Sequence, residues 1–205
     1  MIKKLIKEIV LDGKIPYLMT MKKIALWLAW LTPLSVFFIP HEYKEFAETG
    51  WVVLVAVMII RPLVSIFPDF KILRSLFLLR KEFGIFAGMM IMAHFAGFLI
   101  TKQVSIVDIF TQSTYWQIDS YYFWGILGVL ALIPVLLTSN KTTRLFLKRK
   151  WKSIQRLVYP LFIFGGIHIA ILGESSGLVG VGILVLLLTL DKFKLKIRLP
   201  KNIKF

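Results

Sequence analysis

Hydrophobic residues gather in six long runs along this chain, separated by short polar segments. The runs cover residues 24–39, 46–60, 83–100, 121–137, 157–172 and 175–190. Each is long enough, or nearly so, to cross the ~30 Å hydrocarbon layer of a bilayer, where backbone polar groups must be satisfied within the segment. The pattern therefore predicts an all-α integral membrane bundle of six transmembrane helices. The second helix is expected to end at Arg61-Pro62.

Composition agrees with a membrane protein and narrows its chemistry. The 205 residues are 58% hydrophobic, with 17 Phe, 6 Trp and a mean hydropathy of +0.77, whereas soluble domains are closer to half apolar. There is no cysteine, which excludes disulfides, Cys-ligated zinc and iron–sulfur clusters. The chain also lacks a P-loop, a Gly-x-Ser-x-Gly motif, paired membrane carboxylates and an inverted repeat with broken helices, which weighs against a transporter.

Basic residues fix the expected orientation. Of the 26 Lys and Arg, 24 lie before the first run, in 61–82, in 138–156 or after the last run. Basic residues close to helix ends mark the cytoplasmic side, so both termini are predicted to be cytoplasmic in a multi-pass protein of the inner (plasma) membrane. This topology also accounts for the net charge of +15 without nucleic-acid binding.

The two ends of the chain are expected to lie outside the bundle. Residues 1–21 form a cytoplasmic segment whose apolar positions 2, 5, 6, 9 and 10 oppose Lys3, Lys4 and Lys7, as in an amphipathic helix on the inner leaflet and unlike a cleavable signal. Residues 22–190 form the six-helix domain. Residues 191–205 form a basic cytoplasmic tail, alternating basic and apolar residues like a strand or extended segment. It would attract anionic lipid or an acidic partner.

Two of the three histidines are predicted to lie within the membrane. His94 lies about 12 Å, and His168 about 8 Å, below the outer ends of the third and fifth runs at ~1.5 Å per residue. Ionisable residues at this depth are costly and usually functional. Two neutral imidazoles at matched depth can ligate a haem iron from opposite faces. His41, in the first outer loop, is expected to be a solvated residue, the alternative being contact with a haem propionate or a partner.

Small residues near these histidines suggest room for a porphyrin. Gly97 follows His94 by three residues, Gly165 precedes His168 by three, and Ala87 precedes His94 by seven. The alternative is that they pack helices closely while each histidine donates an interhelical hydrogen bond. Two function classes follow: an electron-transfer haem protein, which the pattern favours, and a haem-free helical membrane protein such as a transporter or assembly factor.

Several blocks of residues resemble the ferric-reductase-like transmembrane proteins over about residues 45 to 172. The blocks are Leu79-Arg80-Lys81-Glu82-Phe83-Gly84-Ile85 before His94, Thr49-Gly50-Trp51, Arg61-Pro62-Leu63, Thr138-Ser139-Asn140, Trp151-Lys152, and Arg156-Leu157-Val158-Tyr159 before His168. Within this family the chain is most similar to the branch that serves as the haem-binding membrane subunit of a periplasmic methionine sulfoxide reductase system.

The resemblance implies a six-helix bundle holding haem b that passes electrons across the membrane, with His94 and His168 as axial ligands. In that branch the extracytoplasmic partner reduces methionine sulfoxide, and a cytoplasmic flavoprotein or a quinone donates electrons. The chain is thus expected to be an electron-transfer subunit rather than a complete enzyme. Another acceptor, such as a different outer reductase or ferric iron, stays open.

One position departs from the family pattern. A histidine expected thirteen residues before His168 is replaced by Gln155, and thirteen helical residues span about 20 Å. The chain is therefore expected to hold one haem on the outer side and none on the inner side. A quinone or flavin bound near Trp151, Gln155 and Arg156 is our hypothesis for how electrons cross the inner half.

Overall fold

Every regular element in the part of the chain that the structure describes is a helix. The computed structural model describes residue 13 and residues 15–198, and the all-α prediction is confirmed for them. The elements in chain order are α2 (Leu18–Ser35), η1 (Pro40–Glu42), α3 (Tyr43–Ile66), α4 (Lys71–Phe77), α5 (Arg80–Lys102), α6 (Ile106–Thr111), η2 (Ser113–Trp116), α7 (Tyr121–Leu137), α8 (Lys141–Leu147), α9 (Arg149–Gln155), α10 (Val158–Ile171) and α11 (Ser175–Lys192).

Four stretches are long and apolar enough to cross a membrane: Pro40–Ile66, Arg80–Lys102, Arg149–Ile171 and Ser175–Lys192. A fifth is added if α7 and α8 form one broken span, although the two helices meet at 91°. The chain is therefore a multi-pass helical membrane protein with four to five candidate spans among its described residues. The first predicted run coincides with α2, which contains Lys22 and Lys23 and is not one of these candidates. The count of six stays a prediction.

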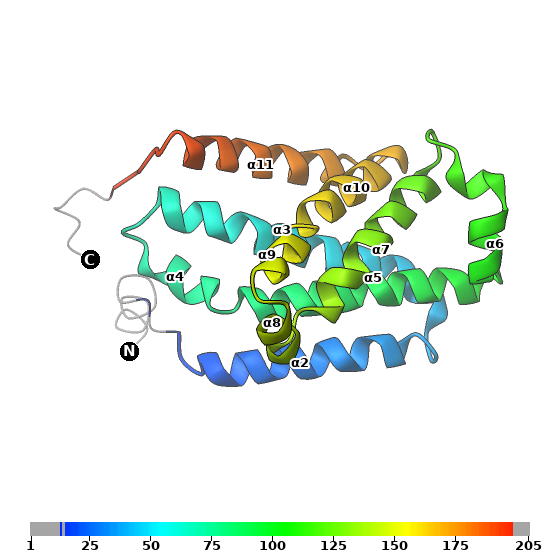
Figure 1. The fold of residues 1–205 in the computed structure, drawn as a ribbon, viewed down its shortest axis with the longest axis horizontal. Coiled ribbons are helices and arrows are strands. Elements are labelled where there is room, and N and C mark those ends of the chain that lie inside the picture. The colour runs from blue at the N-terminus through cyan, green and yellow to red at the C-terminus, as the bar shows by residue number, and fades with distance from the viewer. Residues whose placement is uncertain (1–12, 14, 199–205) are drawn as a thin grey trace.

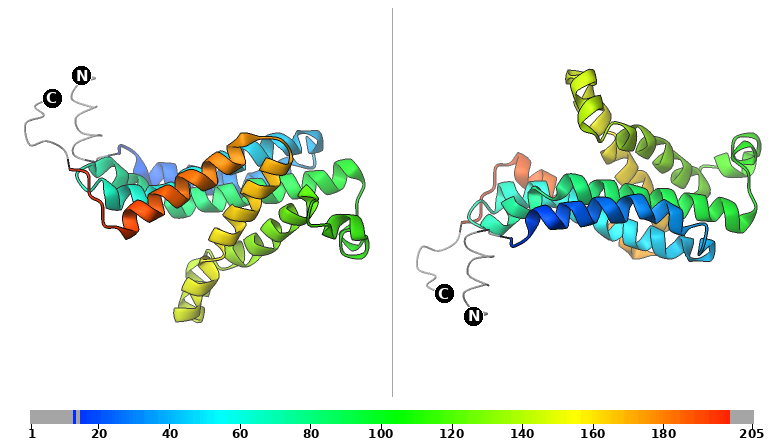
Figure 2. Two further views of the ribbon diagram at one scale, coloured as in Figure 1. Left: turned by 90° about the horizontal axis from the view of Figure 1, so that it is seen from above. Right: turned by 90° about the horizontal axis from the view of Figure 1, so that it is seen from below.

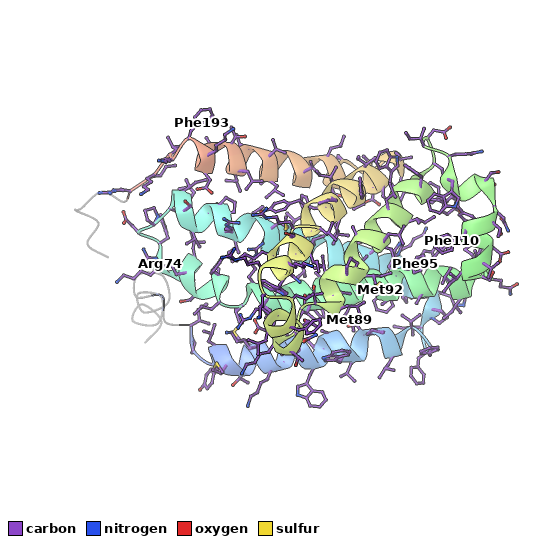
Figure 3. The ribbon with its side chains drawn as sticks, in the orientation of Figure 1. Arg74, Met89, Met92, Phe95, Phe110 and Phe193 are labelled. Carbon is purple, nitrogen blue, oxygen red and sulfur yellow. The ribbon has the colours of Figure 1, made fainter. Side chains whose placement is uncertain are left out.

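Most of the long helices run along one axis of the molecule, and one pair of helices points away from that axis. Helices α2, α3, α5 and α11 run side by side along the length of the molecule (Figure 1). Helices α7 and α10 pack against each other and diverge from the others, with α8 and α9 at the end of the arm that they form (Figure 2). The ends of the described chain lie beside α4, whereas α6 and η2 lie at the opposite end. Figure 3 places Phe95 of α5 and Phe110 of α6 near that opposite end.

The core of the bundle is built around Trp51 of α3. Its indole stacks on Phe162 of α10, with ring centroids 4.8 Å apart and planes at 20°, and its Nε1 donates a hydrogen bond to the backbone oxygen of Ser176 at 3.3 Å. One side chain thereby connects α3, α10 and the start of α11. The surrounding buried side chains come from five helices and include Leu54, Met58, Ala87, Leu132, Leu161 and Leu184.

Glycines let α11 come within backbone contact of α10. A methyl group at Gly177 would overlap the carbonyl oxygen of Gly166, and one at Gly166 would lie 3.1 Å from the carbonyl oxygen of Gly177. Lipid tails are as apolar as leucine, so membrane helices associate through such close packing rather than through the hydrophobic effect. The connection between the two helices passes through Gly173, whose φ of +89° suits glycine alone among common residues.

The prediction that the second helix ends at Arg61-Pro62 is wrong. Helix α3 continues through both residues to Ile66. Pro62 removes one backbone donor from the helix, but its ring is fully buried and Ile66, one turn further on, is 1% exposed. Close packing of these buried side chains against neighbouring helices offsets the lost hydrogen bond, so tertiary packing overrides the local preference of proline.

The described residues include only part of the two predicted terminal segments. The amphipathic pattern of residues 1–12 lies outside the described residues. In the tail, residues 195–198 belong to no helix or strand, and the backbone N–H of Ile197 donates to the carbonyl oxygen of Ile66 at 2.8 Å. This bond holds residue 197 against the end of α3.

The outer surface of the long helices is apolar. Trp27 and Trp30 on α2, and Val185 and Leu186 on α11, are each more than half exposed. A soluble protein rarely exposes contiguous apolar faces of this kind, whereas a lipid-facing helix requires them. The distribution supports contact with a lipid bilayer.

The contact between α10 and α11 generates a stability prediction. Gly177→Val should lower the free energy of unfolding by about 1–3 kcal/mol, the usual cost of overpacking, because the new side chain meets the α10 backbone. The measurement is thermal unfolding of the detergent-solubilised protein, followed by circular dichroism. Gly182→Val, on the same helix but with nothing within 4 Å of an added methyl, is the control and should unfold at the wild-type temperature.

Candidate functional site

The two membrane histidines face each other across the bundle. His94 lies on α5 and His168 on α10, and their ring centroids are 6.3 Å apart with planes at 69°. Both side chains are half-buried. The structure thus brings together two residues that are 74 positions apart in the sequence.

Each ring is held by the same kind of hydrogen bond. Nδ1 of His94 lies 2.8 Å from the backbone oxygen of Tyr43, and Nδ1 of His168 lies 2.8 Å from that of Tyr121. A carbonyl oxygen can only accept, so each Nδ1 must carry the proton. Neutral histidine then presents Nε2 as a free lone pair. Metal-ligating histidines usually donate their other ring N–H in this way, which fixes the tautomer and the ring orientation.

The spacing of the rings suits a single metal ion between them. A metal–imidazole bond of about 2.0–2.1 Å puts each ring centroid about 3 Å from the ion, so two opposed rings have centroids about 6 Å apart. The observed 6.3 Å meets this requirement. No group of three or more His, Cys, Asp or Glu able to hold a metal occurs in the described residues. The pair therefore suits an ion whose remaining ligands belong to a cofactor, as in haem.

Glycines bring the two acceptor carbonyls within reach. A methyl group at Gly97, one turn beyond His94, would lie 2.6 Å from Cβ of Tyr43 and 3.1 Å from the backbone oxygen of Pro40. Gly97 therefore admits the start of α3 against α5. On the other side, a methyl group at Gly125 of α7 would lie 2.9 Å from Nδ1 of His168.

The other small residues of the sequence prediction lie at helix contacts. Ala87 is fully buried in the core beside α3, where a methyl at Gly50 would lie 3.3 Å from its backbone oxygen. A methyl at Gly165 would lie 3.3 Å from the indole of Trp51. Gly97, Ala87 and Gly165 thus all lie where helices pack closely, and their contact with a porphyrin stays a prediction.

The residues predicted to lie near a quinone or flavin, Trp151, Gln155 and Arg156, are found on α9 and at its C-cap. Trp151 Nε1 donates to the backbone oxygen of Thr138 at 2.8 Å, and Gln155 Nε2 donates to Thr138 Oγ1 at 2.9 Å and to the Val135 carbonyl at 3.1 Å. Both side chains fasten α9 to the end of α7. Arg156 is exposed and caps the C-terminus of α9.

The segment between α5 and α7 packs against the ends of these two helices. Ile109 and Tyr115 of this segment pack with Ile126 of α7 into a second buried cluster, and Tyr122 contacts both Phe98 and Tyr115 through its ring. His41 is exposed in η1, as expected of a solvated loop residue.

Sequence reasoning missed the residues that orient the histidines. Tyr43 and Tyr121 act through backbone oxygens, so their side-chain identity gives no signal. Each is the first residue of its helix, α3 and α7. Gly125 could have been noticed only as a small residue one turn beyond Tyr121, and nothing in the sequence connects that turn to His168.

Comparison with known proteins points to one family, through a match that ends before His168. The model of the ferric reductase like transmembrane component matches residues 45–166, more than half of the chain and inclusive of His94. The protein-methionine-sulfoxide reductase heme-binding subunit MsrQ of Agrobacterium fabrum is 28% identical over 96 residues, covering 47% of this chain and 44% of that protein. The subunit of the same name from Brucella anthropi is 30% identical over 90 residues, covering 43% and 40%.

The chain thus spans less than half the length of these curated relatives in the matched region. No solved structure matches it significantly.

The inner clamp generates a second prediction. Gln155→Ala should lower the free energy of unfolding by about 1–2 kcal/mol, because each lost hydrogen bond costs about 0.5–1.5 kcal/mol, and should leave any outer cofactor in place. Thermal unfolding followed by tryptophan fluorescence measures the loss. Gln117→Ala, at an exposed glutamine of the outer segment, is the matched control. Equal stability of the two variants would contradict a clamping role.

Proposed function

The chain belongs to the ferric-reductase-like transmembrane family, and from this premise we propose that it is a membrane haem b protein that delivers electrons to an acceptor on the outer side of the membrane. It acts as the membrane subunit of an oxidoreductase rather than as a complete enzyme. One haem is held on the outer side by His94 and His168.

A single observation carries this proposal. Two histidines from different helices stand 6.3 Å apart, each with Nδ1 committed to a backbone oxygen at 2.8 Å. The arrangement supports two axial nitrogen ligands for one iron, with both Nε2 lone pairs available. Histidines that only bridge helices by a hydrogen bond would have no reason to lie at this distance from each other.

The protein supplies position and insulation for this chemistry. A bound haem supplies a one-electron couple between ferric and ferrous iron. The backbone oxygens of Tyr43 and Tyr121 hold the ligand tautomers, and hydrogen bonding at Nδ1 raises ligand basicity. Phe98 and Tyr122, which pack against the cluster of Ile109, Tyr115 and Ile126, add apolar surface near the pair, and the hydrophobic shell around a metal site tunes its potential.

The outer acceptor is proposed from the relatives. Both are named as subunits of a protein-methionine-sulfoxide reductase, so a reductase subunit of that type is the proposed partner of this chain. Another outer reductase, or ferric iron, is the alternative within the same family. The proposed location is the inner (plasma) membrane, with both termini cytoplasmic.

The inner half of the chain offers no second histidine pair among its described residues, since His41 lies in η1 and the other two form the outer site. The proposed count is therefore one haem. The electron donor is a cytoplasmic flavoprotein or a quinone. If a quinone or flavin binds near Arg156, its contacts must come from groups other than Trp151 Nε1 and Gln155 Nε2, which already donate to α7.

The haem proposal predicts a spectrum with defined mutational behaviour. The purified protein should contain about one low-spin haem b per chain, with a Soret band that shifts on reduction, and His94→Ala or His168→Ala should each reduce the content at least several-fold. His41→Ala is the control, because it removes the third histidine without touching the pair. A wild-type protein that stays haem-free after reconstitution would favour a haem-free membrane protein.

The proposed orientation can be tested because the chain has no cysteine. Single cysteines at two exposed positions, Ser113→Cys in η2 and Thr142→Cys in α8, should differ in reactivity. A membrane-impermeant maleimide added to intact cells or spheroplasts should label position 113 and spare position 142 until the membrane is opened. Labelling of position 142 alone would reverse the topology.

A further inference from the structure

We infer that Gly125 of α7 is a positioning residue for His168, whose bare Cα provides the space in which the imidazole reaches its backbone acceptor. The inference deepens the proposed function, on which its spectroscopic part rests. Gly125 contributes by having no side chain, so the sequence alone gives no sign of its role.

The contacts define this role closely. A Cβ at Gly125 would lie 2.9 Å from Nδ1, 3.2 Å from Cε1 and 3.7 Å from Cγ of His168. The two nearest of these distances are shorter than ordinary van der Waals contact, and the nearest atom is the one that donates to Tyr121. An added methyl therefore pushes on the ring at its hydrogen-bonded edge.

The acceptor and the space lie on one face of α7. Tyr121 and Gly125 are four residues apart, so they occupy the same face of a helix, one turn from each other. The ring of His168 rests over Gly125 while Nδ1 reaches the Tyr121 oxygen at 2.8 Å. A ring displaced from Gly125 cannot keep this bond without moving α10 away from α7.

The His168 ring, and not the α7–α10 contact as a whole, requires a glycine at position 125. At Gly128, one turn further along α7, a methyl group would lie 3.8 Å from Leu161 Cδ1 and 3.9 Å from Phe164 Cβ, which is ordinary contact. Helices α7 and α10 therefore tolerate a methyl group between them where no histidine is present. Gly128→Ala is a matched control on the same helix.

The effect is expected on one ligand only. The His94 ring is held by Tyr43, and for no glycine among the described residues is that ring the nearest neighbour of an added methyl, as the His168 ring is for Gly125. Gly125→Ala should therefore weaken ligation by His168 while His94 stays in place.

The spectroscopic experiment uses the full-length purified protein with its haem. Gly125→Ala should convert a substantial fraction of the low-spin ferric haem to high-spin, seen by optical and electron paramagnetic resonance spectra, and millimolar imidazole should restore the low-spin form by taking the vacated position. Gly128→Ala should keep the wild-type spectrum. A Gly125→Ala protein with a fully low-spin spectrum, or one that matches Gly128→Ala in any defect, would overturn the inference.

A second experiment needs no haem and separates this inference from the proposed function. In haem-free protein, Gly125→Ala should lower the unfolding temperature in the wild-type background but not in the His168→Ala background, because the smaller side chain removes the clash. Such non-additivity reports a direct contact. Equal losses in both backgrounds would overturn the positioning role even if haem binds. Wild-type protein that never binds haem, together with the non-additive result, would refute the haem proposal alone.

Discussion

The structure depends on the position of α3, because both halves of the histidine pair are placed relative to it. The backbone oxygen of Tyr43, at the start of α3, holds His94. Eight residues later, about 12 Å along the helix, Trp51 stacks on Phe162 and so fixes α10, which carries His168. A shift of α3 along its axis would therefore move one ligand relative to the other.

Glycines allow the helices of this bundle to approach closely. Close van der Waals packing matters here because the hydrophobic effect does not drive helices together within a bilayer. Gly166 and Gly177 bring α10 and α11 into backbone contact, and Gly97 admits the start of α3 against α5. Gly125 extends the same principle from packing to ligand geometry. The glycines that shape the site are thus those against which a backbone oxygen or an imidazole ring is placed.

The two ends of α7 are held in different ways. At its first residue, the backbone oxygen of Tyr121 accepts a hydrogen bond from His168 of α10. At its C-terminal end, Gln155 and Trp151 of α9 donate hydrogen bonds to Thr138. The histidine pair therefore lies at one end of α7, and the hydrogen-bonding clamp lies at the other.

The sequence alone determined the helical class, the membrane location of the long helices and the matched depth of His94 and His168, because hydrophobic run length and residue spacing are local properties. It placed the end of the second helix wrongly at Pro62, since burial of that proline is a tertiary effect. Only the tertiary structure decided that Gly97 and Gly165 face neighbouring helices, and that Gln155 is a hydrogen-bonding clamp. It also revealed the carbonyls of Tyr43 and Tyr121 and the space at Gly125, because backbone acceptors and missing side chains leave no mark in a sequence until the fold brings a partner beside them.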